Sequence, residues 1–85
     1  MEVNFIALSG KVYNEGMDVY TKSGKKYNLY TLYSARGMWI RLLCRDSFPM
    51  PVGESVVIFG KTVNLYGSLG VLVVECKKFN EIKAY

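Results

Sequence analysis

Aromatic and cationic side chains alternate along the middle of the chain, and their chemistry suits a partner with both flat rings and negative charge. Tyr27 and Tyr33 are separated by an even number of positions, and so are Trp39, Arg41 and Arg45. In a β-strand, residues at even spacing lie on one face. Aromatic rings offer surfaces on which nucleic-acid bases stack, while Lys and Arg neutralise the phosphates of the same strand. This region is therefore a candidate binding face for a nucleic acid.

The sequence lacks the residues from which most catalytic and metal sites are built. It contains no histidine, which is the commonest general base and metal ligand. Its two cysteines, Cys44 and Cys76, are too few for a zinc site or a disulfide framework. The carboxylates are scattered, and their spacing suggests no nucleophile–base pair or carboxylate dyad. We expect a protein that is not an enzyme and that holds no metal or other cofactor.

Length and composition indicate one small globular domain, residues 1–85. Of the 85 residues 51% are hydrophobic, with one Trp, seven Tyr and four Phe, which excludes a disordered tail. Eleven Lys and Arg against seven Asp and Glu give a net charge of +4 and a pI near 9.1, which favours a polyanionic partner. No apolar run approaches the about 18–20 residues of a membrane span, and no secretion signal is visible. We therefore expect a cytoplasmic protein with no membrane partner.

Turn signals and period-two alternation predict five strands and no long helix. A break or bulge is expected at residues 14–16, and a loop at 46–54, where two prolines exclude a proper helix and Phe48 plugs one end of the core. Gly10, in the first strand, allows another backbone to approach closely. Because five short antiparallel strands would leave free edges, we expect them to close into a small all-β Greek-key barrel. The predicted strands are residues 3–22, interrupted by that break, and 25–33, 38–45, 55–64 and 71–79.

Turn lengths predict which side chains share a face of the sheet. A two-residue turn at Ser23-Gly24 pairs Lys22 with Lys25 and Tyr20 with Tyr27, and a three-residue turn ending at Gly37 pairs Tyr33 with Trp39. One face then combines aromatic and cationic side chains without any acid: Tyr20, Lys22, Lys25, Tyr27, Leu29, Thr31, Tyr33, Trp39, Arg41, Leu43 and Arg45. The opposite face, predicted to form the core, holds Tyr30, Leu32, Met38, Ile40, Leu42 and Cys44.

Three further residues are predicted to extend the binding face. Phe59 and Lys61 point outward if Val56 and Ile58 point into the core, and Tyr66 lies in the last hairpin loop, residues 65–70. The complete set of candidate nucleic-acid-binding residues is Trp39, Arg41, Tyr27, Tyr20, Tyr33, Arg45, Lys22, Lys25, Phe59, Lys61 and Tyr66. The alternative is that these side chains only stabilise the sheet, since Tyr and Trp favour strands and aromatic–Arg pairs form across them.

The chain resembles the single-stranded DNA-binding protein family of the bacterial and phage type along most of its length. Residues 4–12, NFIALSGKV, are similar to that family's first strand, an Asn followed by alternating aliphatic residues and a Gly. Residues 23–24 and 30–32, SG and YTL, are similar to its second strand, and residues 39–43, WIRLL, to its third. Residues 53–60, GESVVIFG, resemble its fourth strand.

The resemblance implies an oligonucleotide/oligosaccharide-binding barrel (OB-fold) in which the Trp matching Trp39 stacks on a base and Arg41 faces the same groove. The sequence departs from the family's pattern in three places. Arg45 stands where the family has an aromatic residue, and residues 46–54 replace the family's helix. No acidic tail of the kind that recruits replication and repair enzymes is visible after Tyr85. The last departure puts a partner-recruiting function in doubt.

These observations favour a sequence-tolerant single-stranded DNA-binding protein that acts in replication or recombination. An RNA-binding barrel is the alternative among nucleic-acid ligands, because it uses the same stacking chemistry. A phage or primosome assembly module that uses the face as a protein interface is the alternative of a different class. A homodimer or higher homo-oligomer is also expected, because the side chains predicted to point outward include Phe5, Val57, Val63, Val71 and Val73, more than one chain easily hides.

Overall fold

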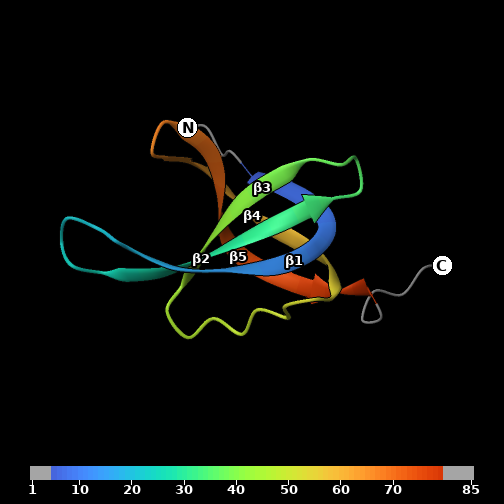
Figure 1. The fold of residues 1–85 in the computed structure, drawn as a ribbon, viewed down its shortest axis with the longest axis horizontal. Helices are drawn as coiled ribbons and strands as arrows, with labels where there is room; N and C mark the ends of the chain where they lie inside the picture. The colour runs from blue at the N-terminus through green and yellow to red at the C-terminus, as the bar shows by residue number, and fades with distance from the viewer. Residues whose placement is uncertain (1–4, 80–85) are drawn as a thin grey trace.

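The protein is built almost entirely of β-strands. The computed structural model describes residues 5–79, and for Glu15 only the backbone. Within that range it contains five strands and no α-helix (Figure 1). The strands are β1 (Phe5–Tyr20), β2 (Lys26–Ser34), β3 (Trp39–Arg45), β4 (Ser55–Leu65) and β5 (Ser68–Lys78). The predicted all-β class is confirmed. No helix among the described residues has the length and hydropathy needed to cross a membrane.

The strands close into a barrel in the order β1-β2-β3-β5-β4. The long strand β1 makes the closure possible, because its first half pairs with β4 and its second half with β2, and the two registers overlap at Gly10 and Lys11. Neighbouring strands are antiparallel except β3 and β5, which pair in parallel from Arg41↔Gly70 to Leu43↔Leu72. This is the order of the five-stranded Greek-key barrel known as the OB-fold. The predicted architecture is confirmed, with one parallel pair in place of a fully antiparallel sheet.

The core lies inside the barrel and is formed by side chains from all five strands. Phe48 and Met50, in the loop between β3 and β4, pack against it, so the predicted plug is confirmed. A Cβ on Gly10 would collide with the backbone carbonyl of Tyr33, so the predicted close approach of two backbones is also confirmed. The buried core residues are Val12, Leu32, Leu42, Cys44, Val56, Ile58, Val71 and Val73.

Two of these core residues, Val71 and Val73, were expected to point outward, and that prediction is wrong. The turn between β4 and β5 has two residues, Tyr66 and Gly67, so Val71 pairs with Thr62 and Val73 with Gly60. Both valines therefore share the inward face with Ile58. Met38 is the opposite case: it was expected in the core, but it follows a hairpin loop and is 57% exposed.

The β1–β2 turn differs from the prediction by one residue. Thr21 and Lys25 close a three-residue loop, in which the Thr21 amide donates to the Lys25 carbonyl at 2.9 Å and Gly24 has φ 86°. Tyr20 consequently pairs with Lys26, and Val19 pairs with Tyr27. The predicted pairs of Tyr20 with Tyr27 and of Lys22 with Lys25 are wrong. The break in β1 is confirmed as a register shift between Asn14 and Met17.

The β2–β3 turn has the same three-residue form and was predicted correctly. The Ser34 amide donates to the Met38 carbonyl at 2.8 Å, and Gly37 adopts φ 81°. The β4–β5 turn is tighter than predicted, because Leu65 pairs with Ser68 and the strands leave no six-residue loop between them. Its two central residues, Tyr66 and Gly67, have φ 50° and 82°, which identifies a type I′ turn.

Candidate nucleic-acid interface

The outward face of β2 and β3 carries the predicted aromatic and cationic residues in the predicted register. Tyr33 pairs with Trp39, Thr31 with Arg41, and Tyr27 with Arg45. The alternation of exposure along β3 fits this arrangement, since Trp39, Arg41 and Arg45 are exposed while Leu42 and Cys44 are buried. The structure thus brings together five of the predicted residues on one surface: Tyr27, Tyr33, Trp39, Arg41 and Arg45.

Three aromatic rings form a cluster at one end of this face. The Trp39 ring lies 4.7 Å from the Tyr33 ring and 5.5 Å from the Tyr13 ring between centroids, with interplanar angles of 52° and 49°. Trp39 on β3 therefore reaches over β2 to a residue of β1. Trp39 remains 63% exposed and the two tyrosines 40% each, so the rings contact one another and still present surface to solvent.

Tyr13 was not among the predicted site residues, although the sequence contains a signal for it. It lies two positions from Lys11 on β1 and pairs with Thr31, which puts both Lys11 and Tyr13 on the outward face beside Tyr33. The alternation of β1 was recognised, but its register against β2 was not. Without that register, Tyr13 and Lys11 had no assigned neighbours.

Cations gather at the other end of the face, around Tyr27. The Lys25 ammonium lies 5.6 Å from the centroid of the Tyr27 ring, and Arg45 is the residue paired with Tyr27 across the strands. Lys22 is exposed in the adjoining three-residue loop. Because Lys25 covers a face of the Tyr27 ring, this end presents charge where the Trp39 end presents aromatic surface.

Between the two ends, the floor of the face consists of Leu29, Thr31, Leu43 and Leu72, and it is mostly apolar and largely buried. Leu29 pairs with Leu43, and Leu43 with Leu72, so these side chains form a row across three strands of the outward face. Leu29 is only 2% exposed although it points away from the core, and Thr31 is only 5% exposed. This part of the face is therefore packed like a second, smaller core.

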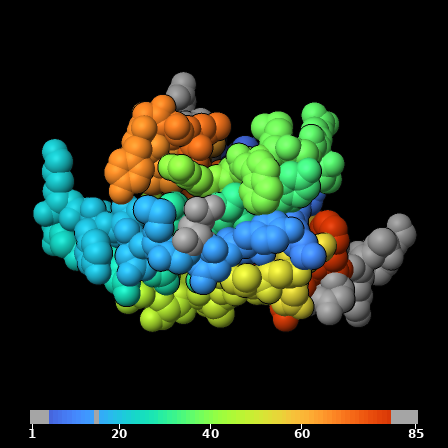
Figure 2. Space-filling model, viewed as in Figure 1, coloured from blue at the N-terminus to red at the C-terminus, as the bar shows by residue number. Residues whose placement is uncertain are grey.

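The β4–β5 hairpin stands beside this floor and carries Tyr66 at its tip. Leu65 is buried, and a Cβ on Gly70 would lie 2.6 Å from its Cδ1 atom and 3.3 Å from the Arg41 carbonyl oxygen. Leu65 thus packs onto Gly70 of the same hairpin, next to β3. Tyr66, the next residue along the chain, is 76% exposed. In Figure 2 the orange tip of this hairpin lies above the blue band of β1, on the same side as the green β2–β3 hairpin.

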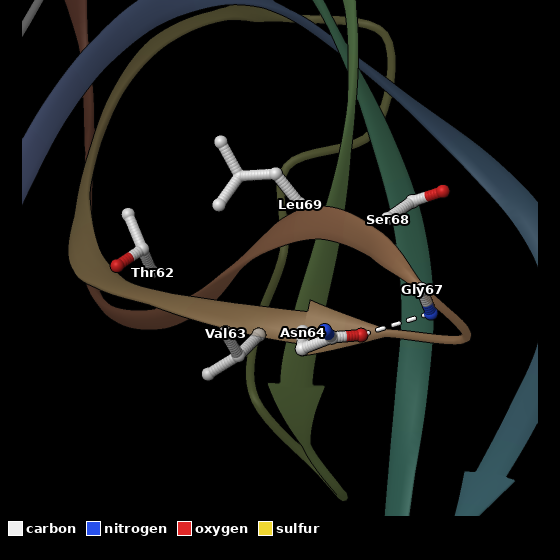
Figure 3. Close-up of a pocket in the computed structure, with 6 residues that line it drawn as sticks. All are labelled: Thr62, Val63, Asn64, Gly67, Ser68 and Leu69. Atoms are coloured by element: carbon white, nitrogen blue, oxygen red, sulfur yellow. Dashed lines mark hydrogen bonds between the residues drawn. The ribbon is translucent and has the colours of Figure 1, made fainter.

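The hairpin also has a shallow hollow close to its turn. Figure 3 shows Leu69 and Thr62 there, and the Asn64 side-chain oxygen, which accepts a hydrogen bond of 2.8 Å from the Gly67 amide and fastens the turn. The residues that line the hollow are Thr62, Val63, Asn64, Gly67, Ser68 and Leu69. None of them is charged, so this side of the hairpin has no side chain that would neutralise a phosphate.

The ion pairs of the described residues do not involve the aromatic face. Lys26 lies 3.7 Å from Asp18 and 3.8 Å from Asp46, on the opposite side of β2 from Tyr27. The other ion pairs of the described residues join Lys77 to Glu75 and Lys78 to Glu54. Within the described range, no ion pair involves the cations of the face, which are Lys11, Lys22, Lys25, Arg41 and Arg45.

Three predicted site residues lie away from this face. Tyr20 points to the opposite side of the β1–β2 hairpin, because the three-residue loop shifts its register by one. Phe59 and Lys61 are on β4, which β1 and β5 separate from β2 and β3 in the barrel order. There Phe59 pairs with Glu75, and the Lys61 ammonium lies 5.6 Å from the centroid of the Phe5 ring. The prediction that β4 extends the aromatic face is wrong.

No protein-family model matches this chain, and no curated protein matches it either. Within the described residues there is also no cluster of His, Cys, Asp and Glu that could hold a metal ion.

Proposed function

We propose that this protein binds single-stranded DNA with little sequence preference and acts in replication or recombination. The observation that carries the proposal is the cluster of three partly exposed rings, Tyr13, Tyr33 and Trp39, on the same face as cations that have no ion-pair partner among the described residues. Bases and phosphates alternate along a single strand, and this face offers a partner to each.

Stacking on the rings supplies affinity that does not depend on base identity. Each base stacked on an aromatic side chain contributes about 1–3 kcal/mol, a range that comes from single-stranded-DNA-binding barrels of this fold. Trp39 is the most exposed ring of the cluster, so it offers the largest free surface. A duplex keeps its base faces inside the helix, so the rings would add nothing to duplex binding.

Phosphate contacts are expected toward the Tyr27 end of the face. Arg41 and Arg45 follow Trp39 along β3, with Lys25 beside Tyr27. β3 has seven residues, and at about 3.3 Å per residue it is about 20 Å long. A strand that follows β3 from the rings to the cations therefore places only a few nucleotides on the barrel, at the low end of the about 4–16 nucleotides known for such domains.

A fluorescence titration tests this function, because Trp39 is the only tryptophan. Adding an oligo(dT) strand should quench its emission, and the logarithm of the binding constant should fall with the logarithm of salt concentration by about 0.7 per phosphate contacted. Arg41→Glu should weaken binding strongly. Lys61→Glu makes the same change of charge on β4, away from the rings, and serves as the matched control.

Several outcomes would reject the proposal. Duplex DNA that binds as well as the single strand, together with an unresponsive Trp39, would exclude stacking on this face. Tighter binding of a matched RNA strand would transfer the function to RNA. Loss of a protein partner in Arg41→Glu without any dependence on salt would favour the assembly module.

A further inference from the structure

The first part of β1 has one edge that no other strand of residues 5–79 covers. Phe5 to Ser9 pair with β4, from Phe5↔Lys61 to Ser9↔Val57, whereas pairing with β2 begins only at Gly10↔Ser34. In an antiparallel ladder every second residue directs its N–H and C=O away from its partner strand. Within residues 5–79, no hydrogen bond joins this edge of β1 to a further segment. The edge is therefore a template for another strand.

An apolar hollow lies directly beside this edge. It runs from β1 to the β2–β3 hairpin and reaches the barrel interior, because Leu8 and Ile40 in its wall are half-buried and pack against the core. Met38 at its margin is 57% exposed. The lining residues are Ala7, Leu8, Ser9, Ser34, Ala35, Arg36, Met38 and Ile40, and of these only Arg36 is charged.

We propose that this edge and hollow bind an extended segment of a partner protein in which apolar and acidic residues alternate. The segment would add a strand beside Phe5–Ser9, and every second side chain would enter the hollow. A polypeptide fits better than a nucleic acid, because only a peptide backbone matches the repeat of donors and acceptors along a strand edge.

The charge beside the hollow selects an acidic segment. Arg36 is exposed and has no ion-pair partner among the described residues. The chain as a whole carries +4. A second copy of this chain is less suitable as the occupant, since its own residues 5–11, FIALSGK, contain a lysine and no acid.

The experiment uses the full chain and a fluorescein-labelled short peptide of alternating Asp and Val, with binding followed by fluorescence anisotropy. Arg36→Glu should raise the peptide Kd about tenfold. Lys22→Glu, the same change in the exposed loop of the other hairpin, should leave it within about twofold. In amide NMR spectra, peptide addition should shift and protect residues 5–9. Arg36 lies in a loop, and a thermal melt of Arg36→Glu checks that the variant folds.

Two control peptides decide between strand addition and other modes of binding. A peptide N-methylated at alternate residues loses the ladder donors on one edge and should not bind, and a Lys/Val peptide should bind far more weakly than the Asp/Val one. Equal binding of either control, or no binding of the Asp/Val peptide, would overturn the proposal. So would a dimer in sedimentation whose residues 5–9 are protected without any peptide, because a second copy then occupies the edge. Oligo(dT) binding is measured separately through Trp39, so either proposal can fail alone.

Discussion

Replacing Tyr66 by Asn is expected to stabilise the protein and weaken its binding to single-stranded DNA at the same time. Tyr66 has φ 50° in the type I′ turn, a left-handed conformation that costs most L-residues about 1–2 kcal/mol. Asn tolerates this conformation, and Asn-Gly is the preferred pair for such a turn. Because 76% of the tyrosine is exposed, little packing is lost on its removal. We expect the free energy of unfolding to rise by about 0.5–1 kcal/mol.

Binding should change in the opposite direction if the tyrosine at the hairpin tip stacks on a base. Loss of one stacking contact costs about 1–3 kcal/mol, which raises the Kd about 5- to 150-fold. For a chain of this size, the expected gain in stability raises the Tm by about 2–8 °C. Circular dichroism melts give the Tm, and quenching of Trp39 by oligo(dT) gives the Kd.

Tyr20→Asn is the matched control, because Tyr20 is also an exposed tyrosine of a hairpin but lies on the side away from Tyr27. Its Kd should stay within about twofold of the unmodified protein. A fall in Tm for Tyr66→Asn would refute the argument from backbone strain. A higher Tm with an unchanged Kd would show that the tip does not contact the strand, while quenching of Trp39 would still support binding on β2 and β3.

Three further predictions concern a close contact between two backbones, a buried thiol and the ring cluster. Gly10→Ala places a Cβ against the backbone carbonyl of Tyr33 and should cost about 3 kcal/mol or more in unfolding titrations. Gly70→Ala should cost less, because its Cβ overlaps only with the flexible Leu65 side chain and lies 3.3 Å from the Arg41 carbonyl oxygen. Burial raises the pKa of the Cys44 thiol from 9.0 to about 12, so the unfolded chain loses this proton first as pH rises. The free energy of unfolding should therefore be unaffected by this group below pH 9 and fall between pH 9 and 12, by up to about 1.4 kcal/mol per pH unit, and Cys44→Ala should remove that fall. Tyr13→Leu should weaken oligo(dT) binding about fivefold or more with little change in the salt dependence, and an unchanged Kd would exclude this ring from the interface.

The parts of the fold that local turn chemistry determines were predictable from the sequence, and those that depend on strand order were not. Gly37 three residues after Ser34 fixed the β2–β3 register correctly, and with it the positions of Trp39 and Arg41. The β1–β2 loop has the same form, but Lys22 was counted as part of the strand. This shift of one residue placed Tyr20 on the wrong side.

The remaining errors have physical causes that no single segment reveals. A tyrosine at the first position of a type I′ turn is unusual, so the tight β4–β5 turn was taken for a longer loop, and Val71 and Val73 were assigned to the surface. Phe59 and Lys61 alternate as predicted, but whether β4 borders β2 or β1 depends on the closure of the whole barrel.

The aromatic face has a role in stability and a proposed role in binding. The exposed fraction of each side chain distinguishes the two roles. Thr31 and Leu29 point outward and are nevertheless 5% and 2% exposed, so the side chains above them contribute to stability. Trp39 instead leaves 63% of its surface in water. The rings that contact it among the described residues are Tyr13 and Tyr33, at interplanar angles of 49° and 52°. A base is flat and apolar on its faces, and it is attached to a phosphate. A single strand would therefore give a partner both to the exposed Trp39 ring and to Arg41 and Arg45, which have no ion-pair partner among the described residues.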